Sequence, residues 1–124
     1  MPVVFQIVFN EISAAEMSQL DTRLQLELLT EFKVTPEDLE NPDGERFGKI
    51  VAREGRELAR YRASDYRIYF EIVDEGLLVH RVLHKNTLRD FLYRSRLPIS
   101  EDEAVGNSKV FWKLIDEAEQ ARRV

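Results

Sequence analysis

The spacing of apolar residues along this chain changes from a strand period to a helical period and back again. Residues 3–9 alternate between the two sides of an extended chain, as a strand does. Between residues 11 and 32 apolar side chains recur at every third or fourth position, which predicts a pair of helices with a break near residues 18–21. Asn10 or Ser13 can cap the start of this helical hairpin.

Three further strands follow a polar segment that contains two prolines and two glycines. Within that segment, Thr35 and Pro36 predict the start of a short helix. Alternating residues then predict strands at 57–62, 66–73 and 77–83. Because the connections between these strands are only a few residues long, the three strands are expected to form an antiparallel meander.

The C-terminal part of the chain predicts two helices separated by a polar connector. Residues 87–94 have helical spacing, and Pro98 prevents this helix from continuing. The sequence ISEDEAVGN, residues 99–107, is expected to be the connector. Residues 108–123 then predict an amphipathic helix whose apolar side completes the core.

Together these elements predict the fold class α+β. The expected architecture is an antiparallel sheet of about four strands with an N-terminal helical hairpin and C-terminal helices, the helices packing on one face. The chain has 124 residues, which suits one domain of ordinary size. Phe47 and Trp112 are expected to be packing residues of this domain rather than residues that stack on bases.

The composition narrows the class of protein. Hydrophobic residues make up 44% and charged residues 33%, as in a globular chain, and no apolar run is long enough to cross a bilayer. The first residues lack the basic region of a signal peptide. There is no cysteine, so disulfides and thiolate metal sites are excluded. We therefore expect a cytoplasmic protein with no membrane partner, and the sequence offers no motif for a metal or cofactor.

The charge is unevenly distributed along the chain. The net charge is −5, which by itself argues against nucleic-acid binding. However, residues 1–44 carry a net −7, residues 45–96 carry +4, and residues 97–124 carry −2. The basic part therefore coincides with the predicted meander, and four of its arginines lie between residues 57 and 85.

These arginines allow two interpretations. Arg60 and Arg62 are two residues apart on one strand and so share a face, Arg67 opens the next strand, and several cations can gather at one end of the meander. On the same rule, His80 and His84 are expected to share a face. Such a cluster can bind phosphate, since the arginine fork donates two parallel hydrogen bonds, or it can simply solvate the outer face of the sheet.

The segment ELARYRASDYRIYFEIVDEGLLVHRVLHK, residues 57–85, resembles the core of the RelE/ParE superfamily of bacterial toxins. The resemblance rests on a basic strand, a turn, the run Ser64-Asp65-Tyr66-Arg67-Ile68, an acidic turn, and a strand ending in His84 and Lys85. The family usually has glycine at the position of Ser64. The resemblance implies a RelE-like domain at residues 1–97 and a C-terminal extension at 98–124 that carries the amphipathic helix.

The resemblance also implies a function. It implies a toxin that cleaves mRNA on the ribosome without a metal or other cofactor, inhibits translation, and is neutralised by a cognate antitoxin. The ribosome and mRNA would be its other partners. By position, the catalytic residues would be Arg67, at the phosphate, Arg60, on the preceding strand, His84, as acid or base, and Arg89 and Tyr93, on the following helix. Residues expected to bind RNA are Arg62, Lys85 and Arg81.

Two alternatives keep the same fold. The acidic isoelectric point of about 5.1 and the extra C-terminal helix suit a non-catalytic interaction or regulatory module that can form a dimer. A gyrase inhibitor of the ParE type is the other alternative. The acidic SEDE sequence of the extension can cover the basic face in cis, dock on a second subunit as a homodimer, or bind another partner.

Overall fold

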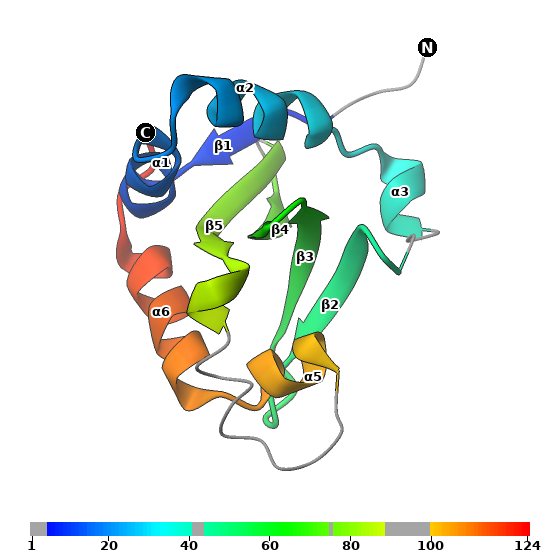
Figure 1. Ribbon diagram of the computed structural model, residues 1–124. Coiled ribbons are helices and arrows are strands. Elements are labelled where there is room, and N and C mark those ends of the chain that lie inside the picture. Colours follow the sequence, from blue (N-terminus) through cyan, green and yellow to red (C-terminus); the bar gives the residue numbers. More distant parts are fainter. Residues whose placement is uncertain (1–4, 41–43, 75, 89–99) are drawn as a thin grey trace.

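The computed structural model describes residues 5–40, 44–74, 76–88 and 100–124. Its centre is a five-stranded mixed sheet in the order β1-β5-β4-β3-β2, so the α+β class is confirmed (Figure 1). The strands are β1 (Ile7–Phe9), β2 (Phe47–Val51), β3 (Glu57–Ala63), β4 (Tyr66–Val73) and β5 (Gly76–His84).

The expected meander is present, but the sheet as a whole differs from the prediction. Strands β3, β4 and β5 pair antiparallel in sequence order. The expectation of about four strands, all antiparallel, was wrong in two respects: β2 adds a fifth strand beside β3, and β1 pairs parallel to β5. The sequence of β2, FGKIV, contains a glycine and a lysine that weaken the strand signal. The alternation of apolar and polar residues does not show whether two strands pair parallel or antiparallel. Only a short turn between the two strands would show it.

The helices lie in two groups, one before and one after the meander. Before it come α1 (Glu11–Ser18), α2 (Thr22–Glu31) and α3 (Pro36–Glu40); after it come α5 (Glu101–Gly106) and α6 (Lys109–Gln120). The predicted break between the first two helices, the short helix at Pro36 and the amphipathic C-terminal helix are confirmed. Among the described helices, none is long and apolar enough to cross a membrane.

The segment expected to be a polar connector contains α5 instead. Ser100 caps this helix, its hydroxyl accepting a hydrogen bond from the Glu103 amide, and three acids occupy the first turn. A serine followed by acids is a typical helix start, because carboxylates interact favourably with the free amides there. The high charge of the segment obscured that signal.

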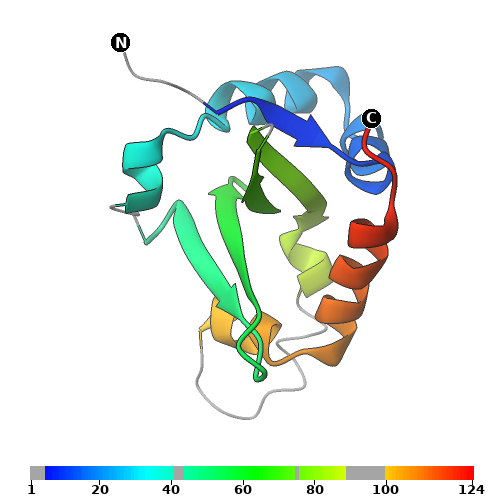
Figure 2. The ribbon, with the colours of Figure 1, turned by 180° about the vertical axis from the view of Figure 1, so that it is seen from behind.

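Each face of the sheet carries its own apolar core, so the expectation that the helices pack on one face only was wrong. The first core joins α1, α2 and the segment after α2 to one face, and the second joins α5 and α6 to the other (Figures 1 and 2). Phe111 and Ile115 of α6 are fully buried in the second core, as predicted. Phe47 and Trp112 are also buried, which confirms their packing role.

A β-bulge in β5 changes which side chains share a face. The register between β4 and β5 shifts at Tyr69/Phe70. As a result, Val79 and Val82 both belong to the first core, although an unbroken strand would place them on opposite faces. His80 therefore lies with Glu71, its Nε2 atom 3.0 Å from Glu71 Oε1, while His84 is on the other face. The prediction that His80 and His84 share a face was wrong for this reason.

The buried side chain of Asn10 connects the start of α1 to β5 and to α6. Its Oδ1 atom accepts a hydrogen bond from the Ser13 amide at 2.7 Å and caps α1, as the sequence predicted. Its Nδ2 atom donates to the carbonyls of His80 and Ala118, at 3.3 and 3.1 Å, and so joins β5 to α6. The C-terminus returns to the same place, where the Val124 amide donates to Phe9 O (Figure 2).

Replacing Asn10 tests how much this junction stabilises the fold. Asn10→Ala should lower the free energy of unfolding by about 2–3 kcal/mol, because it removes a helix cap and leaves buried carbonyls without donors. Asp21→Ala, which removes the exposed cap of α2 alone, should cost about 1 kcal/mol. Urea unfolding of both variants measures the difference, and equal losses would contradict the junction.

Candidate functional site

Four polar side chains lie next to one another on the face of the sheet that α5 covers. Arg60 stands directly opposite Tyr69, and Arg62 directly opposite Arg67, in the pairing of β3 with β4. The members on each strand are two residues apart, so all four share a face, as predicted for Arg60 and Arg62. These four residues are called the arginine face below.

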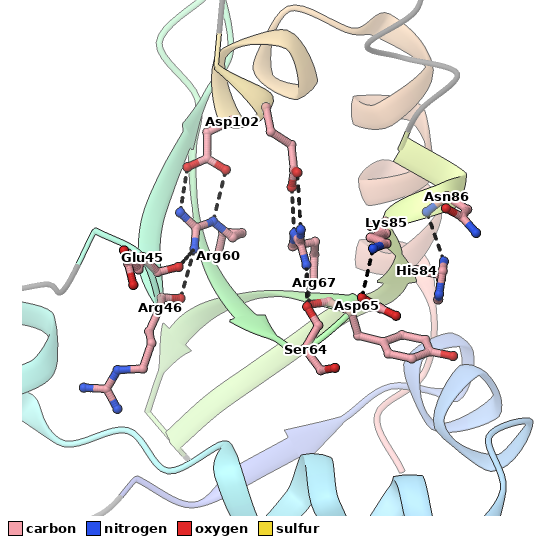
Figure 3. Close-up of polar contacts among 12 residues, drawn as sticks. Glu45, Arg46, Arg60, Ser64, Asp65, Arg67, His84, Lys85, Asn86 and Asp102 are labelled. Carbon is pink, nitrogen blue, oxygen red and sulfur yellow. Dashed lines mark hydrogen bonds and ion pairs between the residues drawn. The ribbon is translucent and has the colours of Figure 1, made fainter.

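Arg60 is almost completely buried and uses all of its donors. It is 1% exposed, and its Nε and Nη2 atoms donate to the two carboxylate oxygens of Asp102, at 3.0 and 2.8 Å (Figure 3). Its Nη1 atom donates to the carbonyls of Glu45 and Arg46, and Nη2 also reaches Gly44 O at 3.4 Å. The guanidinium thus links β3, the segment before β2, and α5.

Gly48 makes room for this arrangement. It lies opposite Arg60 in the pairing of β2 with β3. A Cβ atom at this position would clash with the Arg60 guanidinium and would lie 2.7 Å from Asp102 Oδ2. A residue with a Cβ atom here would therefore require the ends of the Arg60 and Asp102 side chains to shift.

Arg67 makes the second forked ion pair. Its Nε and Nη2 atoms donate to the two oxygens of Glu101, at 2.7 and 3.3 Å, and the residue is 6% exposed. Its Nη1 atom donates to the carbonyls of Ser64 and Tyr66, which belong to the β3–β4 turn (Figure 3). Ser64 has a φ of +56°, in the left-handed region that glycine adopts most readily.

Two buried polar atoms of the arginine face remain without a hydrogen-bond partner in the described part of the chain. They are Nε of Arg62 and the hydroxyl of Tyr69, a residue that is fully buried. Burial, with the carboxylates of Glu101 and Asp102 nearby, raises the pKa of the Tyr69 hydroxyl far above its ordinary value, so it stays protonated as a donor. The two carboxylates of α5 thus satisfy only part of this face.

His84 and Lys85 lie at the end of β5. His84 pairs with Tyr66 across the sheet, and their rings are in edge contact with centroids 4.9 Å apart. Since Tyr66 and Arg67 are consecutive in a strand, His84 and Arg67 point to opposite faces. The His84 Nδ1 atom accepts a hydrogen bond from the Asn86 amide at 3.0 Å (Figure 3). The structure therefore does not bring this histidine to the arginine face.

Lys85 is half-buried and joined to the β3–β4 turn. Its Nζ atom is 3.1 Å from Asp65 Oδ1, and its amide donates to Asp65 O at 2.7 Å. The lysine lowers the pKa of the Asp65 carboxyl through this hydrogen bond and its charge. Lys85 remains accessible to a ligand at this end of the sheet.

The Arg81 side chain makes hydrogen bonds to Glu16 and to the Leu114 carbonyl. Its Nε and Nη2 atoms donate to Glu16 Oε2, at 3.0 and 2.8 Å, and its Nη1 atom donates to Leu114 O at 3.3 Å. Burial raises the pKa of Glu16, although Arg81 and the Val82 amide oppose that shift by hydrogen bonding to the carboxylate. This side chain joins α1, β5 and α6. The other two predicted site residues, Arg89 and Tyr93, lie outside the described residues.

Sequence reasoning found the arginines but missed Gly48 and Tyr69 beside them. One of the three alternatives for the acidic SEDE sequence, residues 100–103, was that it covers the basic face in cis, and Asp102 and Glu101 do pair with Arg60 and Arg67. The alternation of β4 does place Tyr69 on the side of Arg67, so that signal was available. Nothing local in the sequence pairs α5 with β3 and β4, because the contacts span 42 residues for Arg60 and 34 for Arg67.

The comparisons with known proteins add no assignment to this geometry. No protein-family model matches the sequence, and a search of curated proteins finds no similar one. Within the described ranges, no three His, Asp or Glu side chains are grouped so that they could hold a metal ion.

Gly48→Ala tests the close contact beneath Arg60. The added methyl group should separate Arg60 from Asp102 and lower the free energy of unfolding by about 3 kcal/mol, the typical cost of breaking a buried ion pair. Gly44→Ala is the matched control, since a Cβ atom there has no neighbour within 4 Å. Thermal or urea unfolding compares the two. If both variants lose equally little, the contact is not essential.

A double-mutant cycle tests whether Arg81 stabilises the fold through Glu16. Arg81→Ala and Glu16→Ala should each destabilise the protein, with a coupling energy of about 1.5–3 kcal/mol, because the pair makes charged hydrogen bonds in a largely buried place. Urea unfolding of the two single variants and the double variant measures the coupling. A coupling near zero would instead leave Arg81 available for RNA.

Proposed function

We propose that this protein is a RelE-like toxin that binds RNA through the arginine face and cleaves ribosome-bound mRNA. One observation carries the proposal: Arg60 and Arg67 each present a forked pair of donors, from neighbouring strands, to the two oxygens of one anionic group. The same planar fork suits the oxygens of a phosphate. A solvated outer face would not bury arginines to this degree.

The proposed chemistry requires positioning and charge stabilisation. The RNA 2′-OH attacks the neighbouring phosphorus, the bond from phosphorus to the 5′ oxygen breaks, and the 2′ oxygen gives up its proton as the 5′ oxygen gains one. Arg67 and Arg60 stabilise the negative charge that develops on the phosphate oxygens. Lys85 binds a neighbouring phosphate of the RNA strand at the end of the sheet. His84 faces the other side, so in this conformation its acid–base role is not supported.

A second function is favoured by a different observation. Both guanidinium groups are buried and already paired with carboxylates of the same chain. A non-catalytic RelE-fold interaction module would retain exactly those contacts as structure. In that case the sheet serves as a scaffold, and a partner or second subunit binds elsewhere on the surface.

Translation assays separate the two functions. The wild-type protein should cleave mRNA in a bacterial translation extract. Arg67→Gln should reduce the cleavage rate by about 100-fold, because it removes the guanidinium group that stabilises the negative charge developing on the phosphate. Arg53→Gln, at an exposed position outside the arginine face, should cleave as the wild type does. Primer extension on the recovered mRNA measures the cleavage.

The proposal is contradicted if the mRNA stays intact with the wild type and with every variant that folds. These variants include Glu101→Gln/Asp102→Asn, in which both guanidinium groups lack their carboxylate partners. That outcome would favour the interaction module. Growth arrest with intact mRNA and altered plasmid supercoiling would point to gyrase.

A further inference from the structure

The two acids that occupy the arginine face are consecutive residues of one short helix. Asp102 holds Arg60 and Glu101 holds Arg67, each through both carboxylate oxygens. We propose that these acids keep the face closed as an intramolecular substitute for two successive phosphates of RNA, and that RNA binds when they leave. The proposal rests on the RNA-binding function proposed above and adds its regulation.

The two carboxylates resemble phosphates in charge and in the donors that they bind. They are successive anions on one backbone, as the phosphates of a nucleic-acid strand are, and each accepts hydrogen bonds from both nitrogens of an arginine fork. Exchanging one anion for the other preserves the hydrogen bonds of Arg60 and Arg67. The cost of opening is therefore offset when the ligand arrives, since neither guanidinium stays buried without a partner.

The unsatisfied atoms of the arginine face provide an independent argument. The Tyr69 hydroxyl and Arg62 Nε are buried donors without partners in the described part of the chain. A buried donor left unpaired costs about 1–3 kcal/mol, so two carboxylates are an incomplete ligand for this face. An RNA backbone offers more acceptors in the same space, since each nucleotide adds ester and 2′ oxygens to its phosphate oxygens.

The attachment of α5 allows its acidic end to move separately from its C-terminal end. Ala104 and Val105 are buried, and the Trp112 indole donates to Gly106 O at 2.8 Å, so the C-terminal end belongs to the second core. The N-terminal turn depends on the exposed Ser100 cap and the two ion pairs. A helix of one or two turns has little stability of its own. Loss of those pairs therefore frees the acidic turn while the anchor remains in place.

The departure of Glu101 and Asp102 also changes the net charge of the arginine face. In the closed state three guanidinium groups face two carboxylates. When the acids leave, three positive charges become available on adjacent strands. This local gain matters in a chain of net charge −5, because RNA affinity depends on the cations that neutralise phosphates.

Binding assays with charge-matched variants test the closure. Glu101→Gln/Asp102→Asn should bind fluorescein-labelled single-stranded RNA at least about tenfold more tightly than the wild type, as expected if the open state is populated below about 10%. The control Glu54→Gln/Glu103→Gln removes the same charge at two exposed positions, one of them on α5, and should bind as the wild type does. Fluorescence anisotropy at fixed salt measures RNA affinity, and calorimetry measures pyrophosphate affinity.

A measurement on the wild-type protein guards against a variant that fails to fold. The amides of Glu103 and Ala104, which donate to Ser100 in the acidic turn, should exchange hydrogen faster when RNA is bound, whereas those of α6 should not change. Equal affinity of the wild type and Glu101→Gln/Asp102→Asn, with unchanged exchange in α5, would overturn the closure. Tighter pyrophosphate binding by that variant without RNA binding by any protein would support the closure and contradict the RNA function. No binding of either ligand would overturn both.

Discussion

A guanidinium group buried in the face of a sheet requires a partner for each of its donors, and Arg60 imposes this requirement on three parts of the chain. Three carbonyls come from the segment before β2, and the carboxylate comes from Asp102 of α5. Gly48 leaves room for the group, since a Cβ atom there would force the Arg60 and Asp102 side chains to shift. The positions of β2 and α5 relative to β3 thus depend on one side chain.

The sheet is covered on both faces because each face carries its own apolar core. The first core needs α1 and α2 on one side, and the second needs α5 and α6 on the other. Because α5 carries Val105 into the second core and Asp102 onto Arg60, apolar packing and ion pairing position the same short helix. Arg81 and Asn10 then join α6 to the opposite end of the domain. The acidic residues of α5 are therefore part of the packed structure.

The sequence predicts the elements that depend on neighbouring residues better than the contacts between residues far apart in the chain. Strands β3 to β5 and helices α1, α2 and α6 were predicted because their periodicity and turns are local. The bulge at His80 shifts the faces by one residue without a distinctive sequence, and β2 is defined only by its pairing with β3. The arginines were identified as a group, and the acidic SEDE sequence was one candidate to cover them. Which acid pairs with which arginine was not predicted, since α5 approaches them only in the folded chain.

The cluster is also informative because it is a poor solution for stability alone. Well-packed apolar residues often stabilise a fold as much as a buried ion pair or more, and an unpaired donor adds a further cost. Here the protein buries Arg60 and Arg67 with two carboxylates, while the Tyr69 hydroxyl beside them has no hydrogen-bond partner within the part of the chain that the structure describes. Departures of this kind from local stability rules concentrate at functional sites, where a ligand supplies the missing contacts. A purely structural role accounts for Arg81, whose carboxylate and carbonyl partners are in place. It leaves the Tyr69 hydroxyl without a hydrogen-bond partner among the described residues, and the anionic ligand proposed above would supply the missing acceptor.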